Sequence, residues 1–145
     1  MTFTAHELAY LRSQPLARLS TVAPDGQPDV VPVAFEFDGT YFWVGGGGVS
    51  VLATRKFRNV PEGGEAQVAL VVDDLPSFDP FTARGLRVYG IAAGPFERTG
   101  AMGPGHFLRI TPTRSWGWNL EGEKPVPVGD TWYEARYAEH ARPSA

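Results

Sequence analysis

Three cations in one short stretch are the residues of this chain whose types and spacing most clearly allow chemistry. Arg55, Lys56 and Arg58 lie within four positions, in a chain with 13 Lys and Arg residues and a formal net charge of -3. Arg can bind an anionic group through two parallel hydrogen bonds, and Lys adds a point charge. The cluster therefore suits a phosphate, although a basic run is also typical of a solvated helix end.

The sequence around these cations predicts a hinge followed by a short helix. Four consecutive glycines at 45–48 are unsuited to a packed strand, and Ser50 is a favourable helix N-cap. We therefore expect a short amphipathic helix over residues 50–59. Helical spacing places four of its side chains on one face, which mixes apolar and cationic groups. These side chains are Leu52, Arg55, Lys56 and Asn59.

A proline inside an apolar strand is a second feature of interest. Residues 29–37 read as one continuous strand that contains Pro32, and proline cannot donate a hydrogen bond within a sheet. Pro32 is therefore expected at a sheet edge or in a β-bulge. Bulges often direct backbone groups towards a ligand, but a plain edge strand explains the proline equally well, so both interpretations stay open.

Side chains for acid–base, nucleophilic or metal chemistry are scarce. The chain has no cysteine, which excludes disulfides, thiolate metal sites and a cysteine nucleophile. The three histidines, His6, His106 and His140, match no nucleophile or metal-binding motif. The sequence thus predicts no catalytic side chain and no metal ion. It favours a binding module, or an enzyme whose cofactor supplies the chemistry.

Length and composition predict one globular domain over residues 1–145. The chain is 43% hydrophobic and 20% charged, which is typical of a folded domain of this length. The mildly acidic balance argues against a general nucleic-acid-binding protein. No apolar run approaches the roughly 20 residues that span a bilayer, and residues 1–14 do not resemble a signal peptide. A cytoplasmic protein without membrane contact is expected.

The pattern of turns and apolar runs predicts a mainly β fold. Thr4 and Glu7 form a capping box that opens a helix over about residues 4–14. Turn signals at Asp25-Gly26 and Asp38-Gly39 predict antiparallel hairpins, the second with a two-residue turn. The expected strands are residues 16–23, 29–37, 40–44, 66–72, 85–93 and 107–118, and residues 132–139 form a helix or a strand. Six strands with short turns indicate a closed or nearly closed antiparallel barrel.

Large aromatic side chains raise the question of self-association. Trp43, Trp116, Trp118 and Phe35 are more large aromatics than a barrel of this size needs to bury, and aromatics are enriched in interface cores. A homodimer is expected on this ground, although the same side chains could instead fill the barrel.

An ordered set of short motifs resembles the pyridoxamine 5'-phosphate oxidase-like split-barrel superfamily, and within it the flavin/deazaflavin oxidoreductases of group B. No single motif is specific, but together they run through nearly the whole chain. They are LSTV at 19–22, DGQP at 25–28, VPV at 31–33, TRKFRN at 54–59, VDD at 72–74, RGLRVYG at 84–90 and RITPTRSWG at 109–117. The four glycines at 45–48 and Gly63-Gly64 depart from the family pattern.

The resemblance implies a six-stranded FMN-binding type of split barrel, a homodimer, and a cofactor between the protomers. Members use FMN or the deazaflavin coenzyme F420. The family's phosphate-binding positions fall on Thr54, Arg55, Lys56 and Asn59. The family's Pro-Val step beside the tricyclic ring falls on Pro32-Val33.

The expected function is an F420-dependent oxidoreductase that transfers a hydride to an unidentified organic substrate. An FMN-binding flavin oxidoreductase or oxidase, or a cofactor-binding protein without turnover, is the alternative. The choice of F420 over FMN comes from the resemblance alone. F420 carries a longer anionic tail, for which Arg58, Arg84 and Arg87 are candidate partners.

Overall fold

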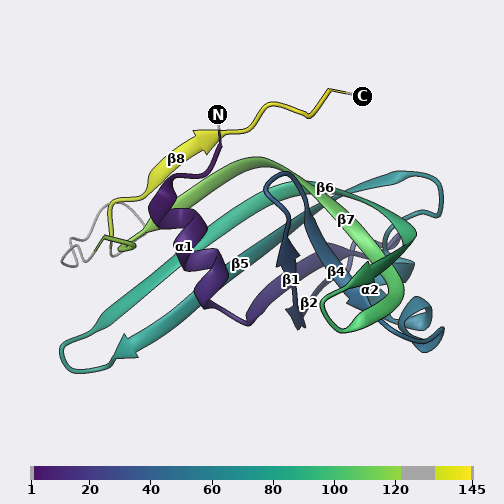
Figure 1. The fold of residues 1–145 in the computed structure, drawn as a ribbon, viewed down its shortest axis with the longest axis horizontal. Helices are drawn as coiled ribbons and strands as arrows, with labels where there is room; N and C mark the ends of the chain where they lie inside the picture. The colour runs from purple at the N-terminus through teal and green to yellow at the C-terminus, as the bar shows by residue number, and fades with distance from the viewer. Residues whose placement is uncertain (1, 122–132, 145) are drawn as a thin grey trace.

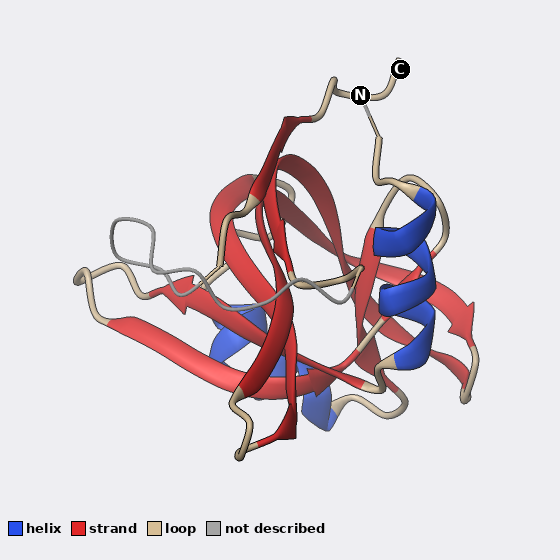
Figure 2. Ribbon diagram, turned by 90° about the vertical axis from the view of Figure 1, so that its left-hand side faces the viewer, coloured by secondary structure: helices blue, strands red, loops and turns tan. Residues whose placement is uncertain are grey.

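A computed structural model of the chain, which describes residues 2–121 and 133–144, shows one antiparallel sheet with two short α-helices (Figure 1). The elements are α1 Ala5–Ser13, β1 Leu16–Val22, β2 Pro28–Ala34, β3 Glu36–Phe37, β4 Phe42–Gly46, the 3-10 helix η1 Ser50–Ala53, α2 Arg55–Arg58, β5 Glu65–Ser77, β6 Thr82–Gly100, β7 Gly103–Trp118 and β8 Arg136–Glu139. The two α-helices lie apart, against different parts of the sheet (Figure 2). Within the described ranges, no helix has the length and apolar character needed to cross a membrane.

The sheet closes on itself. Its strand order is β2-β1-β5-β6-β7-β4-β3, and β2 and β3 are two parts of one chain segment interrupted at Phe35. This segment pairs with β1 through its first part and with β4 through its second. The predicted six-stranded antiparallel split barrel is therefore confirmed, and β8 is an additional strand beside β7.

Alternation of side chains along the strands fills the barrel. Ala17, Leu19 and Thr21 of β1 are buried, while the residues between them lie on the outside or near it. The same alternation places Val33 of β2 inside and Pro32 outside. Because successive strand residues point to opposite faces, each strand contributes one apolar row to a single core.

The predicted first helix is confirmed together with its capping box. Thr4 Oγ1 accepts a hydrogen bond from the Glu7 N–H at 3.1 Å, and Glu7 Oε1 accepts one from the Thr4 N–H at 2.9 Å. Leu11 is buried in the core and Leu8 packs against it. Glu7 itself is buried and paired with Arg136 of β8 at 2.8 Å, a role that the capping motif does not predict.

The hairpin of β5 and β6 is much longer than the sequence predicts. The predicted strand ends at residue 72, but the ladder continues past Asp73 and Asp74 to the pair Ser77 and Thr82. The reason is that neither carboxylate is left unpaired on the sheet. Asp73 lies 3.5 Å from Arg18, and Asp74 accepts two hydrogen bonds from Arg84, at 2.7 and 2.9 Å.

Other strand expectations are refined in the same way. The continuous strand over 29–37 is wrong, because Phe35 interrupts it. A hairpin does follow, but its loop spans residues 38–41 and not two residues, since Asp38 Oδ1 accepts from the N–H groups of Thr40 and Tyr41. Pro32 lies on a strand that pairs only with β1 at that position, which confirms the edge alternative. Of the two alternatives for 132–139, the described part is the strand Arg136–Glu139.

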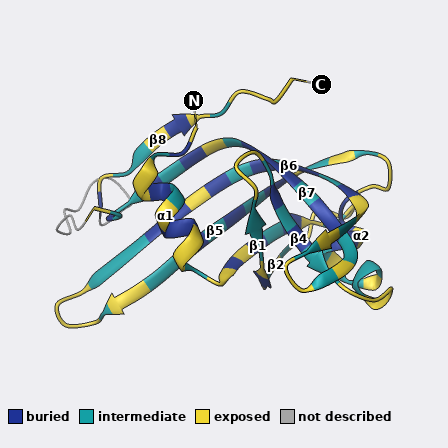
Figure 3. Ribbon diagram, viewed as in Figure 1, coloured by how far each residue is buried: buried dark blue, intermediate teal, exposed yellow. Residues whose placement is uncertain are grey.

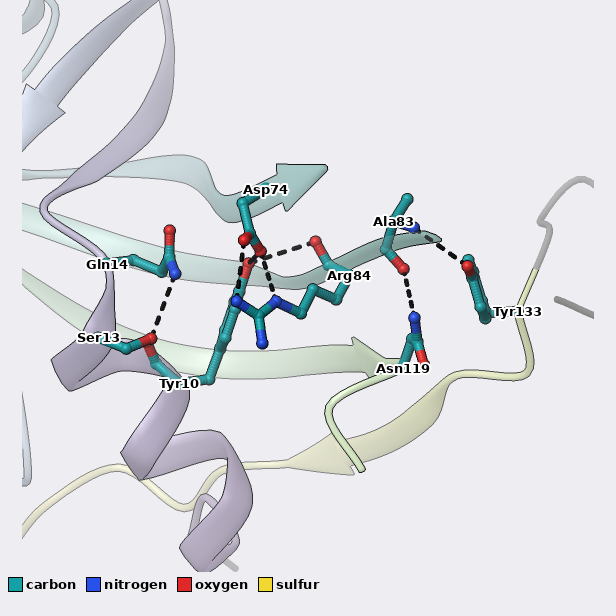
Figure 4. Close-up of polar contacts among 8 residues, drawn as sticks. All are labelled: Tyr10, Ser13, Gln14, Asp74, Ala83, Arg84, Asn119 and Tyr133. Atoms are coloured by element: carbon teal, nitrogen blue, oxygen red, sulfur yellow. Dashed lines mark hydrogen bonds and ion pairs between the residues drawn. The ribbon is translucent and has the colours of Figure 1, made fainter. Parts of the chain in front are cut away.

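A polar cluster ties α1 to the β5–β6 hairpin (Figure 4). The Tyr10 hydroxyl donates to Asp74 Oδ1 at 2.6 Å, and Arg84 holds the same carboxylate. Burial and the hydrogen bond to Asp74 raise the pKa of the Tyr10 hydroxyl. The hydrogen bonds from Arg84, opposed by burial, lower the pKa of Asp74. Each charge is matched within the cluster, so its role is to fix the helix on the hairpin.

Replacing Tyr10 with Phe should lower the free energy of unfolding by about 1–2 kcal/mol, because it removes a hydrogen bond to a charged and partly buried group. Urea unfolding at neutral pH measures the loss. Tyr41→Phe is the control, because Tyr41 contacts its neighbours through its ring, 6.1 Å from Trp43. Equal losses for the two variants would contradict the role given to the Tyr10 hydroxyl.

Candidate functional site

The basic stretch forms two short turns and not the single helix predicted for 50–59. A 3-10 helix over Ser50–Ala53 is followed by Thr54 in an extended conformation (φ -70, ψ 153), and α2 begins at Arg55. The Thr54 hydroxyl donates to the Val51 carbonyl oxygen at 2.6 Å, which offers the backbone an alternative to helical bonding. Ser50 is not the N-cap, because Val49 holds that position and no side-chain cap is made.

Within the part of the chain that the structure describes, no carboxylate pairs with the three cations of this turn. Arg55 and Arg58 are exposed and Lys56 is half-buried. None of them forms an ion pair with another residue in the described ranges. Three cations without a described ion-pair partner fit an anionic ligand, because the ligand does not have to displace a carboxylate before it binds.

Asn59 does not share an exposed face with these cations, which corrects the helical-spacing argument. It is only 7% exposed, and its Nδ2 donates to the buried Thr21 Oγ1 at 2.9 Å. This bond ties α2 to β1 across 38 positions of sequence. Asn59 Oδ1 is buried and has no partner among the described residues. No local sequence signal links Asn59 to Thr21.

A cavity of about 360 Å³ lies beside Arg55, between α2 and the turn that joins β1 to β2. Asp25 and Asp29 line this cavity together with Arg55. Asp29 Oδ2 is buried without a hydrogen-bond partner in the described structure. These two carboxylates make the Arg55 side of the turn less favourable to an anion than the Lys56 side. No motif in the sequence links this turn to the basic stretch.

Pro32 and Val33 lie further along the strand whose first residues border this cavity. Pro32 is exposed on the outer face of β2 and pairs with Arg18 across to β1, whereas the Val33 side chain is buried in the core. The side of β2 at Pro32 that faces away from β1 is unpaired among the described strands. Backbone polar groups on that side of an edge strand make no ladder hydrogen bonds to the described strands, so a ligand can contact them.

The outer face around Pro32 continues across the sheet as one row of cross-strand neighbours. The row is Pro32, Arg18, Val71, Arg87, Trp116 and Tyr137. The Trp116 ring lies 5.3 Å from that of Tyr137, and the Arg87 guanidinium lies 4.2 Å over it. This face carries stacked aromatic and aliphatic groups on the surface of the molecule.

Of the four aromatics named as interface candidates, only Trp116 belongs to this outer row. The Trp43 indole N–H donates to Asp38 Oδ2 at 2.8 Å, and the Arg98 guanidinium lies 4.5 Å from the centre of the Trp43 ring. Trp118 packs against Gly85, where an added Cβ would collide with its ring. Phe35 packs on the core, 6.1 Å from Phe42. The structure therefore does not bring these four side chains together.

The three histidines lie in separate places and serve different contacts. His6 lies 3.1 Å from Glu121, and His106 lies 3.7 Å from Glu97. His140 Nε2 and the buried Ser115 Oγ are 2.8 Å apart, which fixes the end of β8 against β7. Burial lowers the pKa of His140 below its ordinary value of 6.5.

The pH dependence of stability should follow from His140. Because its folded pKa is depressed, the unfolded chain binds the proton first as pH falls, and the folded chain loses stability. The contribution is complete above about pH 6.5 and is lost as pH falls through the folded pKa. His140→Gln should flatten the decline in unfolding free energy between pH 7 and pH 5. An equally steep decline in His140→Gln and in the parent, measured by urea unfolding at each pH, would contradict this role of His140.

The chain is similar to proteins of one known family. A family profile described as pyridoxamine 5'-phosphate oxidase matches residues 3–119. A protein of Streptomyces rimosus named 5a,11a-dehydrotetracycline/5a,11a-dehydrooxytetracycline reductase is 39% identical over 132 residues, which cover 88% of this chain and 91% of that protein.

Two solved structures share the fold. HupZ of Group A Streptococcus has a TM-score of 0.58 at 19% identity, covering 79% of this chain and 93% of its own. A structure described as an F420 reductase has a TM-score of 0.50 at 23% identity, covering 72% of this chain and 92% of its own. At these identities the likeness shows a common fold.

Proposed function

Because the chain belongs to the pyridoxamine 5'-phosphate oxidase family, we propose that it is an F420-dependent reductase of a conjugated carbon–carbon double bond. The chain is an oxidoreductase of that family, and the observation that carries the proposal is its 39% identity to the dehydrotetracycline reductase. The name of that relative describes the addition of two hydrogens across one unsaturated bond of a polycycle. We propose a substrate of the same class, a conjugated polycyclic enone, for this chain.

The basic turn fits the phosphate of such a cofactor. Lys56 and Arg55, with the start of α2 at Thr54, hold the phosphate in this proposal, and their charges are not neutralised by described neighbours. Lys56 is the stronger contributor, since Arg55 shares its cavity with Asp25 and Asp29. Asn59 acts by orienting α2 through Thr21, and so contributes to the phosphate site indirectly.

The ring of the cofactor lies along β2 in this proposal. Pro32 and Val33 present backbone groups on the open side of the strand, and Val33 fixes the strand by burying its side chain. When bound, F420 supplies the hydride, so the protein needs to bind, orient and shield. A general acid or base must lie within hydrogen-bond reach of the reacting atoms. The three histidines lie in separate places, which fits a reaction in which the cofactor supplies the chemistry.

F420 is proposed over FMN because the motif set resembles group B of the flavin/deazaflavin oxidoreductases, and a protein of the same fold is described as an F420 reductase. Of the three candidate cations for the F420 tail, Arg84 is committed to Asp74 and Tyr10. Arg58 and Arg87 form no ion pair within the described structure and retain the role.

A homodimer completes the proposal. The outer face that runs from Pro32 to Tyr137 exposes apolar and aromatic groups next to the ring position. Burying such a face against a second copy removes apolar surface from water and covers the ring.

The test is a pair of titrations followed by a turnover assay. The protein is titrated with F420 and with FMN, and binding is followed by the absorbance and fluorescence of each cofactor. Reduced F420 is then mixed with the protein and 5a,11a-dehydrotetracycline. We expect micromolar or tighter F420 binding, and reoxidation of reduced F420 only when protein and substrate are both present. Tight FMN binding without F420 binding would support the FMN alternative. F420 binding without turnover of conjugated enones would support a cofactor-binding protein that has no catalytic activity.

A further inference from the structure

A cavity of about 620 Å³ lies between α1 and the segment around β3. Its large apolar side chains come from the chain before α1, from α1 itself and from both sides of Glu36, and they are Phe3, Leu8, Leu11, Phe35 and Phe37. Concave, largely apolar spaces of about 300–1,000 Å³ are the usual binding sites of small molecules. We call this space the α1 cavity. Its described lining residues include none of the basic turn and neither Pro32 nor Val33, so it is separate from the proposed cofactor position.

Phenylalanine rings form one wall of the α1 cavity. The Phe37 ring lies 5.3 Å from that of Phe3 and 4.5 Å from that of Phe42, and the Phe35 ring lies 6.1 Å from that of Phe42. Phe42 is fully buried, whereas Phe35 and Phe37 pack on the core and remain half-buried beside the cavity. An aromatic ligand can add one more ring to this cluster, because aromatic rings gain from offset and edge-to-face contacts.

One flank of α1 contributes a cation to the same cavity. Leu8 and Arg12 are four positions apart, which places them next to each other on one face of the helix, and both line the cavity. Figure 3 shows buried, half-buried and exposed residues along α1. Leu8 is half-buried and Arg12 is exposed in the last turn. The cavity therefore combines an apolar interior with a cation at its rim.

Arg12 is the charged side chain of the α1 cavity that is available to a ligand. In the part of the chain that the structure describes, Arg12 forms no ion pair. The two carboxylates that line the cavity are engaged. Glu36 lies 3.5 Å from Arg98 and accepts from the Ala101 N–H at 3.1 Å, and Asp38 accepts three hydrogen bonds within its own hairpin. A ligand carboxylate can therefore pair with Arg12 without displacing another anion.

We propose that the α1 cavity binds a small aromatic carboxylate, with its rings against Phe35 and Phe37 and its carboxylate on Arg12. The phenylalanine wall holds the rings by contact and by removal of apolar surface from water. The Arg12 guanidinium orients the ligand through charge-assisted hydrogen bonds. This ligand is additional to the cofactor, so the inference goes beyond the proposed function and does not depend on where the cofactor lies.

The first experiment tests the class of ligand with three naphthalene derivatives that share one ring system. 2-Naphthoate, 2-naphthylmethanol and 2-naphthylmethylamine are each titrated into the parent protein by isothermal calorimetry at low salt, where charge interactions are least screened. We expect 2-naphthoate to bind about fivefold more tightly than the alcohol, the scale of one exposed ion pair, and the amine to bind most weakly. Equal affinities for the three, tighter binding of decanoate than of 2-naphthoate, or no binding at millimolar concentration would overturn the proposal.

The second experiment places the carboxylate by reversing single charges. Arg12→Glu changes the rim of the α1 cavity, and Lys56→Glu makes the same change in net charge at the basic turn. We expect Arg12→Glu to bind 2-naphthylmethylamine more tightly than 2-naphthoate, which reverses the order of the parent. Lys56→Glu should keep the parental order. If Arg12→Glu keeps the parental order, or if Lys56→Glu alone reverses it, the anion does not bind at Arg12 and the proposal fails.

The third experiment fills the cavity. Leu8→Trp places an indole among the lining residues, whereas Ala9→Trp adds the same ring at the next, exposed position, which does not line the cavity. Circular dichroism and urea unfolding establish that each variant is folded. We expect Leu8→Trp to weaken 2-naphthoate binding by about tenfold or more, and Ala9→Trp to match the parent. Parental affinity in a folded Leu8→Trp variant would contradict the site, and if Leu8→Trp does not fold, the ligand order of Arg12→Glu decides.

Cofactor titrations separate this site from the proposed function. F420 should bind with the same affinity in the absence of 2-naphthoate and at its saturating concentration. Competition between the two would place 2-naphthoate in the cofactor site and overturn the second site, while leaving the proposed function in place. If the parent binds neither F420 nor FMN, the proposed function has failed, and the naphthalene titrations still decide whether the α1 cavity binds an aromatic carboxylate.

Discussion

Replacing Lys56 with alanine should weaken binding of both F420 and FMN by about ten- to a hundredfold. A charge-assisted hydrogen bond to phosphate contributes about 1.5–3 kcal/mol, which corresponds to that range of affinity. Lys56 is half-buried and has no ion-pair partner in the described structure. Its charge is therefore available to a ligand and partly shielded from solvent ions.

Isothermal titration with each cofactor measures the effect, and Arg12→Ala is the matched control. Arg12 is an exposed cation in the last turn of α1, so its loss changes the net charge equally without touching the basic turn. Lys56→Ala should keep the unfolding midpoint of the parent, because the side chain makes no hydrogen bond that the structure describes. If Lys56→Ala binds both cofactors as tightly as the parent, the phosphate has been placed on the wrong residues.

Replacing Arg136 with alanine should lower the free energy of unfolding by about 2–4 kcal/mol, the largest loss expected from a single ion pair here. Glu7 is the most deeply buried carboxylate of the described chain, at 2% exposure. Its Oε1 accepts from Arg136 at 2.8 Å and from the Thr4 N–H at 2.9 Å, while its Oε2 has no described partner. Removing the guanidinium leaves a buried charge without its counter-ion.

Arg142→Ala is the control for this prediction. Arg142 meets Glu65 at the same 2.8 Å, but both side chains are more than half exposed. Exposed pairs contribute little, so this change should cost less than about 1 kcal/mol. Adding Glu7→Gln to Arg136→Ala should recover part of the lost stability, because a neutral amide is less costly to bury alone. Equal losses for Arg136→Ala and Arg142→Ala, measured by urea unfolding, would contradict the importance given to burial.

Local chemistry in the sequence was enough to predict the architecture. The capping box at Thr4 and Glu7, the turn residues at Asp25-Gly26 and the alternating apolar rows act over a few neighbouring positions. Each of these signals survives in the structure. Pro32 likewise had to lie where no ladder hydrogen bond is needed, because that restriction is built into its ring.

The extent of the elements depended on partners that are distant in sequence. The β5–β6 hairpin continues past Asp73 and Asp74 because Arg18, Arg84 and Tyr10 pair with them. In the basic stretch, a 3-10 turn and an extended Thr54 replace the predicted helix. Helix propensity is weak over so few residues, and contacts with the barrel decide the conformation.

In the candidate site, too, the sequence identified single residues, while their contacts depended on the tertiary structure. The sequence by itself identified the three cations and the strand proline, since charge and backbone restriction belong to single residues. Only the tertiary structure decided that Asn59 turns inward to Thr21 and that Asp25 and Asp29 line one cavity with Arg55. It also left Phe78 exposed in the turn between β5 and β6. These facts depend on burial and on contacts across the fold, which arise when the barrel closes and are absent from any local pattern.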